Sequence, residues 1–453
     1  MKTVFITIPM GLIYRNIIKT GITKQLKDAG FKVVILSPAY KDQIFIDEMT
    51  KEGLIVEPLF AYLPKGLEMA IVNFSNNLVF TETTKVKLAV ERDNKNYGAW
   101  LSKILIYKLF GQSLWLKNLL EKIDNKYFVK NLYQDLFQKY KPDLVFSTHL
   151  IYHDDIELIK EAKKAGIKTV GMVMSWDNLT SKGAVHVKTD KLIVWNEIMK
   201  KEAVELAGFK PEDVVMTGIP QFDFYFQPDK IVSREEFFAK NNLDPNKKLI
   251  VYGAGTNKTT PNEPSVLKIL NDYISQGKIA YPVELMLRLH PKAFLRKEYD
   301  WLKNLKNIKS ESPGRSLESF MDVWFPTDED IWHMVNLIYH CDLVINTFST
   351  FTIDAFGFGK PVINICFDGE KTDIPYGKSV RRYFDYTHYL HIIKGNGVKV
   401  AHNSEELLLA INAYLNDPKL DFLGRENTLK QQAYIYDNQS AQRVINYLLL
   451  QLE

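Results

Sequence analysis

A hydroxyl-rich turn lies inside the stretch from Cys341 to Phe367. Two apolar runs, Leu343 to Ile345 and Val362 to Ile365, flank this turn and a short helical segment, an order that predicts strand, helix and strand. Ser349 and Thr350 fall where the first strand gives way to the helix, so hydroxyl and backbone N–H groups would gather there. Such a turn can bind a phosphate, or its side chains can simply cap the helix. The stretch alone leaves both interpretations open.

Two more sets of residues follow predicted strands in the same half of the chain. Gly253, Gly255 and Thr256 form a glycine-rich turn after the strand Lys248 to Tyr252, where backbone N–H groups could approach a ligand. Arg288 and His290 end the strand Glu284 to Leu289, which Pro291 stops. Taken alone, the glycine-rich turn is a weak signal for ligand binding. Arg288 alone would be interpreted as a solvated side chain, and His290 alone as a packed one. Together with the hydroxyl-rich turn they predict a joint anion site.

A charged loop ends a predicted strand in the first half of the chain. The strand Thr169 to Met174 leads into the loop Ser175 to Gly183, which carries Asp177, Asn178 and Lys182. Loops at the carboxyl ends of strands in open α/β sheets are where ligands bind. We therefore expect this loop to contact a ligand.

The length and the order of predicted elements indicate an α/β fold with two Rossmann-like domains. The chain has 453 residues, 46% of them hydrophobic, which is enough for two cores. We expect an N-terminal domain over residues 1–235 with a helical insertion at about 63–140, a C-terminal domain over 236–425, and a C-terminal helix over 426–453 that crosses back to the N-terminal domain. The first helix is predicted over Gly11 to Ala29. The turn Pro9 to Arg15 before it lacks Gly-x-Gly-x-x-Gly, which disfavours an NAD or FAD enzyme.

Charge, cysteine use and hydropathy exclude other classes. The formal net charge of +4 is small for this length and gives no argument for nucleic acid. Cys341 and Cys366 lie in or beside predicted buried strands, which favours reduced thiols over a disulfide or a zinc site. No run of about 18 apolar residues is present, and the chain enters a strand directly, so we expect a cytoplasmic protein.

The segment from Trp100 to Leu120 has a helical period and is rich in aromatic residues and lysine. It contains no acidic residue before Glu121. Such a face can lie on an anionic surface, which predicts peripheral association with the inner face of a membrane through residues 100–120. The alternative, which the sequence favours, is a helix packed on the first domain with its lysines in water.

Several of these motifs, taken together, resemble those of the GT-B superfamily. They are Trp176-Asp177-Asn178 with Lys182-Gly183, Gly218-Ile-Pro-Gln-Phe-Asp223, Arg288-Leu-His-Pro291, and Thr347-Phe-Ser-Thr-Phe-Thr-Ile-Asp354 with Gly359-Lys-Pro361. Within it they are most similar to the CDP-glycerol glycerophosphotransferase-like and bacterial surface-polysaccharide glycosyltransferases. The likeness covers residues 143–418, and motifs in the right order are more specific than any single one.

The resemblance implies a fold and a set of site residues. The fold is GT-B, with two parallel sheets facing each other across a cleft, the acceptor mainly on the N-terminal domain, the donor on the C-terminal one, and a last helix that often crosses back. In related enzymes the His-Pro histidine and the paired hydroxyls contact the donor phosphate, which assigns that role to His290, Ser349 and Thr350. The predicted donor-binding set is Gly253, Gly255, Thr256, Arg288, His290, Ser349, Thr350 and Asp354, with no resident cofactor.

Position 177 departs from the glycerophosphotransferase pattern, which has Trp-His-Gly where this chain has Trp176-Asp177-Asn178. The same pattern has Asp-Tyr-Ser-Ser where this chain has Thr347 to Thr350. An Asp base is common in inverting sugar transfer, so the first exchange favours a transferred sugar, with Asp177 and His290 as catalytic residues. Such proton transfer is worth about 10²- to 10⁴-fold. The alternative is that Asp177 only caps its loop.

Sugar transfer passes through an oxocarbenium-like state, and negative charge grows on the departing phosphate. Asp328-Glu-Asp330 could suggest a metal, but it leads into a helix and complements the helix dipole. Arg288, His290 and the hydroxyl-rich turn offer the same stabilisation, which predicts metal-independent transfer.

The sequence therefore predicts a glycosyltransferase. The donor is a nucleotide-activated sugar based on cytidine or uridine, and the acceptor is a bacterial surface glycan or a lipid-linked molecule. Two alternatives remain, a CDP-alditol phosphotransferase of the teichoic-acid type and a non-catalytic GT-B scaffold. A sugar-nucleotide 2-epimerase shares the two-domain plan, but its expected histidine and acidic residues are not matched clearly.

Overall fold

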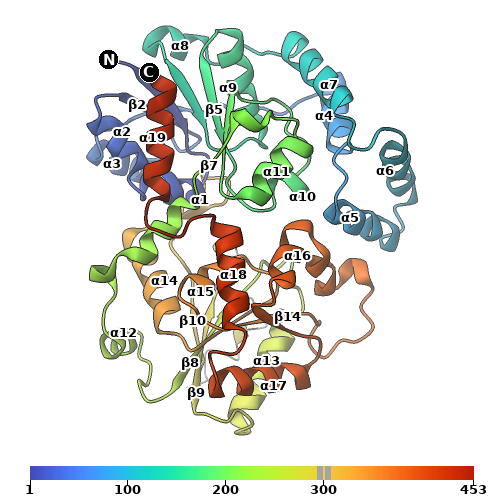
Figure 1. Ribbon diagram of the computed structural model, residues 1–453, viewed down its shortest axis with the longest axis vertical. Helices are drawn as coiled ribbons and strands as arrows, with labels where there is room; N and C mark the ends of the chain where they lie inside the picture. The colour runs from blue at the N-terminus through green and yellow to red at the C-terminus, as the bar shows by residue number, and fades with distance from the viewer. Residues whose placement is uncertain (293–298, 301–307) are drawn as a thin grey trace. The chain divides into compact units, whose positions relative to one another are not determined.

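The computed structural model describes residues 1–292, 299–300 and 308–453 (Figure 1). The chain forms two compact units. Unit 1 contains Met1–Asp223, Leu317–Phe325 and Ala433–Glu453, and unit 2 contains Phe224–Ser316 and Pro326–Gln432. The chain thus leaves unit 1 twelve residues before the predicted boundary at residue 235 and returns to it twice.

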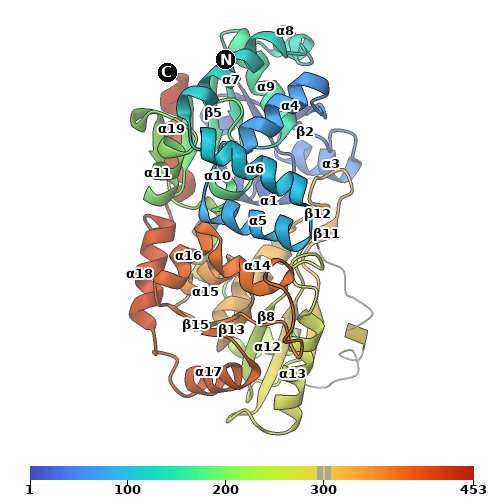
Figure 2. The same ribbon diagram turned by 90° about the vertical axis from the view of Figure 1, so that its right-hand side faces the viewer.

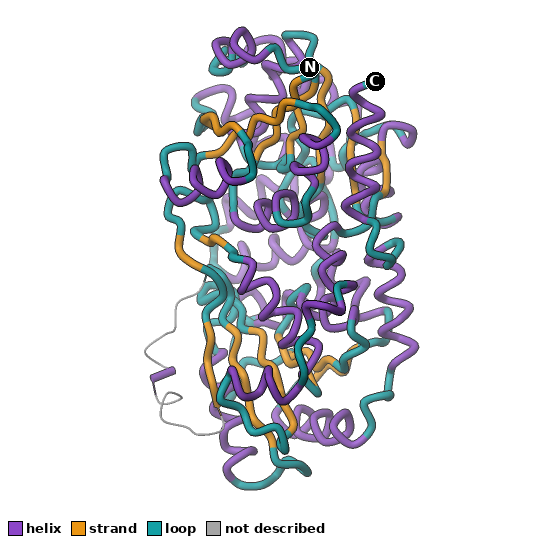
Figure 3. The backbone as a smooth tube through the Cα atoms, turned by 90° about the vertical axis from the view of Figure 1, so that its left-hand side faces the viewer, coloured by secondary structure: helices purple, strands orange, loops and turns teal. Residues whose placement is uncertain are grey.

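Unit 1 is built on a seven-stranded parallel sheet with the order β3-β2-β1-β4-β5-β6-β7 (Figure 3). Its central strands are buried apolar runs, as expected for a parallel sheet that is covered on both faces, whereas the edge strands β3 and β7 are only partly buried. The strand order reverses between β1 and β4, which makes the carboxyl ends of these two strands the switch point of the sheet. The strands are β1 (Thr3–Thr7), β2 (Lys32–Ser37), β3 (Ile55–Pro58), β4 (Leu144–Ser147), β5 (Lys168–Met172), β6 (Lys191–Val194) and β7 (Val214–Met216).

The predicted first helix, Gly11 to Ala29, is wrong as a continuous element. The chain forms α1 (Gly11–Ile13), a π-helical turn over Tyr14–Ile18 and then α2 (Ile22–Asp28). Gly21, with a φ of 79°, separates the two helices in a left-handed conformation that a side chain would disfavour. At the start of α1, the Asp322 carboxylate accepts the N–H groups of Gly11 (2.9 Å) and Leu12 (3.1 Å). A protein carboxylate therefore occupies the place where dinucleotide enzymes bind a pyrophosphate.

A group of helices separates β3 from β4, where the sequence predicts a helical insertion. Figure 2 shows α4 to α7 along one side of unit 1. The helices are α4 (Gly66–Asn76), α5 (Glu82–Asp93), α6 (Tyr97–Phe110), α7 (Leu114–Tyr127) and α8 (Gln134–Tyr140). The other helices of unit 1 are α3 (Gln43–Lys51), α9 (His153–Lys164), α10 (Asn178–Ser181), α11 (Glu197–Glu205) and α19 (Ser440–Leu452).

A buried ammonium group attaches the insertion to α9. Lys160 is 3% exposed, and its Nζ lies 3.2 Å from Glu68 of α4 and 2.7 Å from Asp124 of α7. Glu157, one turn before Lys160 on α9, lies 3.8 Å from the same Nζ. Because a lone buried charge is very costly, these carboxylates and Lys160 must stay together for unit 1 to fold.

The helix α19 belongs to unit 1, where it contacts α2. The Asp223 carboxylate accepts the backbone N–H groups of Ser440 (3.1 Å) and Ala441 (2.8 Å) at the start of the helix. Arg443 donates to the Thr217 carbonyl at 2.7 Å. The aspartate of the Gly218-to-Asp223 motif thus caps the last helix.

Unit 2 contains a six-stranded parallel sheet with the order β10-β9-β8-β13-β14-β15. The predicted strand, helix and strand inside Cys341 to Phe367 are present as β13, α15 and β14. The strands are β8 (Lys248–Gly253), β9 (Val283–Arg288), β10 (Ile308–Glu311), β13 (Leu343–Asn346), β14 (Val362–Ile365) and β15 (Val398–Ala401). The helices are α12 (Arg234–Lys240), α13 (Glu263–Ser275), α14 (Asp328–His340), α15 (Phe351–Gly357), α16 (Thr387–Lys394), α17 (Ser404–Asn416) and α18 (Phe422–Ala433).

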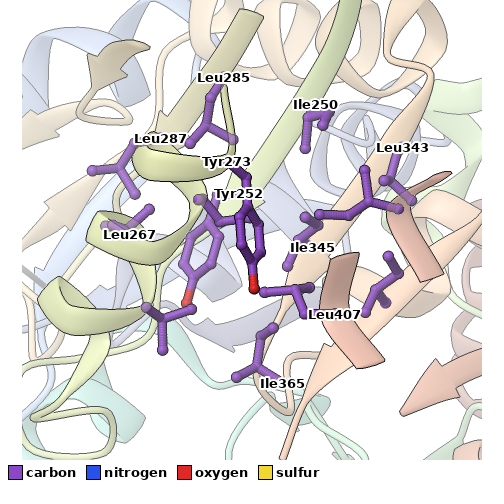
Figure 4. Packing of buried hydrophobic residues seen from close by; sticks show 14 of the residues in the cluster. Ile250, Tyr252, Leu267, Tyr273, Leu285, Leu287, Leu343, Ile345, Ile365 and Leu407 are labelled. Atoms are coloured by element: carbon purple, nitrogen blue, oxygen red, sulfur yellow. The ribbon is translucent and has the colours of Figure 1, made fainter. Parts of the chain in front are cut away.

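The core of unit 2 lies between this sheet and its helices. Figure 4 shows Tyr252 of β8 packed among leucine and isoleucine side chains from the neighbouring strands and from α13 and α17. Cys341 and Cys366 are both free and buried, and burial raises the pKa of each thiol to about 12. Asp330, part of the acidic run Asp328 to Asp330, accepts the backbone N–H of Thr327 and closes a capping box at the start of α14.

Within the described part of the chain, none of the helices has the length and apolar character needed to cross a bilayer.

A buried carboxyl group lies below the switch point of unit 1 and gives a pH-dependent prediction. Asp155 accepts the hydroxyls of Thr7 (2.6 Å) and Ser147 (2.8 Å), while burial raises the pKa of its carboxyl to about 7. The folded state therefore holds this proton up to about pH 7, whereas the unfolded chain loses it near pH 4. Stability contributed by this group is present below pH 4 and is lost as the pH rises to 7.

Replacing Asp155 by Asn should remove that dependence. We expect the difference in unfolding midpoint, Asp155→Asn minus wild type, to increase between pH 5 and pH 8, as measured by thermal unfolding. The exposed Asp135→Asn on α8 serves as the control and should show no such trend. A flat difference for Asp155→Asn would contradict the raised pKa.

Candidate functional site

The predicted motifs of unit 2 leave one edge of its sheet. Arg288, Gly253 and Asn346 are register partners at the carboxyl ends of the adjacent strands β9, β8 and β13. His290 follows β9 by two residues, and Ser349 follows β13 by three. Since neighbouring strands lie about 4.8 Å apart, the structure brings the histidine, the glycine-rich turn and the hydroxyl-rich turn to the same stretch of this edge.

His290 is poised to donate a hydrogen bond. Its Nδ1 accepts the backbone N–H of Lys292 at 3.0 Å. Burial, together with the positive charge of Lys292, lowers the pKa of the imidazole to about 4, so the ring is neutral at pH 7. A neutral ring that accepts at Nδ1 carries its proton on Nε2. His290 therefore offers an N–H group to a ligand and no positive charge.

Ser349 has the capping role that the sequence left open. Its Oγ accepts the Phe351 N–H at 3.2 Å, and its backbone N–H donates to Asn346 Oδ1 at 3.1 Å. Thr350 precedes α15 and makes no side-chain cap. A hydroxyl that accepts can still donate its own proton, so capping by Ser349 is compatible with ligand binding. Both side chains are half-buried.

A buried polar network fixes the hydroxyl-rich turn, and the sequence reasoning missed it. Asn364 of β14 donates to Asn346 at 3.0 Å and accepts the Tyr389 hydroxyl at 3.0 Å. Thr352 accepts from Asn346 at 3.1 Å. All four side chains are completely buried. An available signal was the asparagine in each of two apolar runs, Leu343 to Asn346 and Val362 to Ile365, because a buried amide needs hydrogen-bonding partners.

Arg288 is held by protein partners. Its guanidinium forms a salt bridge with Glu311 of β10, whose other oxygen lies 2.5 Å from His333 Nε2 on α14. Burial alone would raise the pKa of the Glu311 carboxyl. The contacts with His333 and Arg288 outweigh this effect, so the pKa of the carboxyl is lowered overall. The arginine predicted as an anion ligand thus also joins β9 to β10, and Glu311 and His333 were not predicted.

The glycine-rich turn is largely satisfied by its own neighbours. The Gly255 N–H donates to Glu263 at 2.9 Å, and the Thr256 hydroxyl lies 2.9 Å from that of Thr259. A Cβ at Gly255 would lie 2.6 Å from Thr260 Oγ1, and one at Gly253 would lie 3.0 Å from the Phe351 ring. These glycines therefore allow close packing of the turn.

Two further contacts define the surroundings of the hydroxyl-rich turn. Asp354, predicted to bind the donor, accepts the hydroxyl of Tyr225. Phe348 stacks on Tyr383 with 3.9 Å between ring centroids, and the Arg382 guanidinium lies 4.3 Å from the Tyr383 ring centroid. The aromatic and basic stretch from Arg381 to Tyr389, which the sequence reasoning left outside the site, thus packs against the turn.

In unit 1, Asp177 lies in the loop after β5, as predicted. Its Oδ2 lies 3.1 Å from Lys182 Nζ and 3.1 Å from Ser181 Oγ. The side chain is partly exposed. Trp176, just before it, packs edge-on against Trp195 with 4.7 Å between centroids and also contacts Phe222. The Trp176-Asp177-Asn178 and Gly218-to-Asp223 motifs therefore meet in one aromatic cluster.

The insertion holds the other end of this loop. Asn76 Oδ1 of α4 accepts the Ala184 N–H at 3.0 Å, and the Thr81 hydroxyl donates to the Thr180 carbonyl at 2.8 Å. Gly183 has a φ of 109°, and a Cβ there would lie 2.2 Å from Asn76 Oδ1. Only glycine fits at this position, so the loop conformation depends on α4.

His149 is a further polar residue at the switch point of unit 1. It follows β4 by two residues, is buried, and accepts the N–H of Tyr152 at 3.1 Å through Nδ1. Its ring stacks on that of Tyr152 at 3.8 Å. The sequence does carry a signal for this residue, a histidine directly after a buried apolar strand, but His149 was not among the predicted site residues.

Comparisons with known proteins agree with this architecture. The family model for monogalactosyldiacylglycerol (MGDG) synthase matches residues 72–220, about a third of the chain. No curated protein matches the sequence.

Solved structures share the fold over nearly the whole chain. A glycosyltransferase from Rickettsia africae is 13% identical with a TM-score of 0.53, covering 99% of this chain and 98% of its own. The S. aureus MnaA–UDP co-structure is 14% identical with a TM-score of 0.55, covering 100% and 98%. The UDP-GlcNAc 2-epimerase from Neisseria meningitidis, bound to UDP-GlcNAc, is 12% identical with a TM-score of 0.55, covering 99% and 100%.

The fold is GT-B, as the sequence motifs predicted. The family match and the shared fold together support the predicted glycosyltransferase. The match at residues 72–220 includes α5, α6 and the Asp177 loop, the region where the insertion meets the sheet of unit 1.

The buried network behind the hydroxyl-rich turn yields a stability prediction. Tyr389→Phe leaves the buried Asn364 oxygen without its hydroxyl donor, which should cost about 1–3 kcal/mol of unfolding free energy. Chemical denaturation measures this loss. Tyr339→Phe, on an exposed ring of the same unit, is the matched control and should change stability by less than about 0.5 kcal/mol. Equal effects of the two variants would contradict the network's role.

Proposed function

We propose that this protein is a glycosyltransferase that moves a sugar from a nucleotide-activated donor to a lipid-linked or surface-glycan acceptor. The observation that carries the proposal is the meeting of His290 with the hydroxyl-rich turn at one sheet edge of a GT-B fold. Two of the similar structures are complexes with UDP and with UDP-GlcNAc, which favours a uridine donor over a cytidine one.

The residues at the edge of unit 2 supply hydrogen bonds to the departing phosphate. The Nε2–H of neutral His290 and the hydroxyls of Ser349 and Thr350 are donors, and they would act on the oxygen where negative charge develops. Each such donor stabilises the developing charge most when it is already held in position. The Asn346–Asn364 network holds the hydroxyl-rich turn in this way. The proposed transfer uses these donors without a metal.

Asp177 is proposed as the base that removes the acceptor's proton. Its carboxylate is held at Oδ2 by Lys182 and Ser181. The ion pair with Lys182 holds this carboxylate in the loop that follows β5. The deprotonated acceptor oxygen would bond to the sugar carbon on the face opposite the departing nucleotide phosphate, a single displacement that inverts the configuration of this carbon.

The insertion favours a lipid-linked acceptor. No residue of α6 is buried, and Leu101, Leu105 and Leu109, spaced by four residues, are 58%, 58% and 62% exposed. Trp115 on α7 is 72% exposed. The structure thus leaves this apolar row exposed, while Ile104, Ile106 and Tyr107 of the same helix are half-buried. An exposed apolar row beside lysines such as Lys108 suits the surface of an anionic membrane.

Donor binding is tested by substitution of His290. Thermal-shift screening with CMP, CDP, UDP and GDP should show stabilisation by UDP above the others. His290→Ala should weaken binding of the stabilising nucleotide at least tenfold in calorimetry and lower the transfer rate about 10²- to 10³-fold. The exposed His402→Ala, in the same unit, should change neither. Unchanged binding by His290→Ala would remove this residue from the site, and no shift with any nucleotide would favour the scaffold alternative.

Membrane association is tested by sedimentation with phosphatidylglycerol-containing vesicles. Leu105→Ser with Leu109→Ser removes apolar area that would enter the bilayer interface, so partitioning should fall at least about tenfold. Leu409→Ser, at a 70% exposed leucine of α17, is the matched control and should partition as the wild type. Wild-type protein that stays in solution at low salt would disprove the association.

A further inference from the structure

An open cavity lies between the insertion and the loop that follows Asp177. Its volume is about 450 Å³, within the range of small-molecule sites. Three lysines and no acidic residue line it, and we call it the lysine cavity. The lining residues are Asn73, Asn76, Asn77, Val79, Thr84, Lys87, Leu88, Lys103, Tyr107, Thr180, Ser181, Lys182 and Gly183.

The three ammonium groups are not fully neutralised. Lys103 lies 2.5 Å from Glu91, and Lys182 lies 3.1 Å from Asp177. Lys87 donates to the Ser181 carbonyl and, among the described residues, has no carboxylate within salt-bridge distance. Reduced hydration of its ammonium, together with the charge of Lys182, lowers the pKa of Lys87. Two carboxylates for three ammonium groups leave a positive charge at the cavity.

Polar groups accompany this charge. Asn76 accepts the Ala184 N–H through Oδ1, and the amide N–H₂ group of the same side chain is a hydrogen-bond donor. Asn73, Asn77 and the hydroxyl of Tyr107 line the same space. Lysines combined with amide and hydroxyl donors match an oxyanion with several oxygens, such as a phosphate.

We propose that the lysine cavity binds a phosphate group of the acceptor, an inference that rests on the proposed glycosyl transfer. Lys182 faces both the cavity and Asp177. A phosphate that engages Lys182 would draw its ammonium away from the Asp177 carboxylate. Without the ammonium beside it, the carboxylate would be a stronger base, which couples acceptor binding to the base.

The binding site is tested on the full-length protein with inorganic pyrophosphate in calorimetry. Lys87→Gln keeps an N–H donor for the Ser181 carbonyl but removes the unpaired charge, so the dissociation constant should rise at least tenfold. Lys85→Gln, on the same helix but outside the cavity lining and paired with Glu82, is the matched control and should bind within twofold of the wild type. Because the donor site of unit 2 is also proposed to bind phosphate, His290→Ala should still show the binding event that Lys87→Gln loses.

These variants separate the two sites. Loss of pyrophosphate binding in His290→Ala but not in Lys87→Gln would place the anion in unit 2 and overturn the proposal. Unchanged UDP binding in His290→Ala, together with loss of pyrophosphate binding in Lys87→Gln, would instead contradict the donor assignment and leave the lysine cavity standing.

The source of the phosphate is tested by protection of Lys87 from acetylation, read by mass spectrometry. Phosphatidylcholine vesicles containing a polyprenyl phosphate should protect Lys87 more than vesicles of phosphatidylcholine alone, with Lys85 acetylated equally in both. Protection by pyrophosphate but not by the phosphate lipid would overturn a lipid acceptor, and protection by neither would overturn the site.

Discussion

The buried ammonium of Lys160 is the interaction on which the rest of unit 1 depends. It joins carboxylates from α4 and α7 to α9, which lies on the sheet. Helix α4 then holds the Asp177 loop through Asn76, and the neighbouring Thr81 holds it through the Thr180 carbonyl. A buried ion cluster of this kind is a poor source of net stability, but it tolerates few alternative arrangements. The position of the loop that carries Asp177 is therefore tied to one arrangement of buried charges.

In unit 2, neutral buried groups position the hydroxyl-rich turn. The amides of Asn346 and Asn364 and the hydroxyl of Tyr389 fix the hydroxyl-rich turn from behind, within an otherwise apolar core. In both units, apolar strands form the frame, and buried polar contacts at the carboxyl edge determine where the loops lie. This division explains why the loops can hold hydrogen-bond donors in fixed positions although they lie at the end of the sheet.

Much of the frame could be predicted from the sequence, because apolar runs followed by polar turns identify parallel strands and the edge where they end. The stretch from Cys341 to Phe367 is an example. Contacts between distant segments could not be predicted. Arg288 resembled a ligand because its partner Glu311 lies on a strand that the sequence reasoning did not identify. The contact of Asp322 with the start of α1 was not predicted, since nothing near either segment in the sequence indicates it. The segment from Trp100 to Leu120 has the same period whether its leucines are packed or exposed.

The returns of the chain to unit 1 have a consequence for synthesis. Unit 1 begins at Met1 but needs Asp322 at the start of α1 and Ser440–Leu452 against α2. Unit 2 has all its segments once Gln432 has emerged from the ribosome, whereas unit 1 still lacks Ala433–Glu453 at that point. The segments of the N-terminal unit are therefore completed after those of unit 2, which differs from the usual order in which the N-terminal domain folds first.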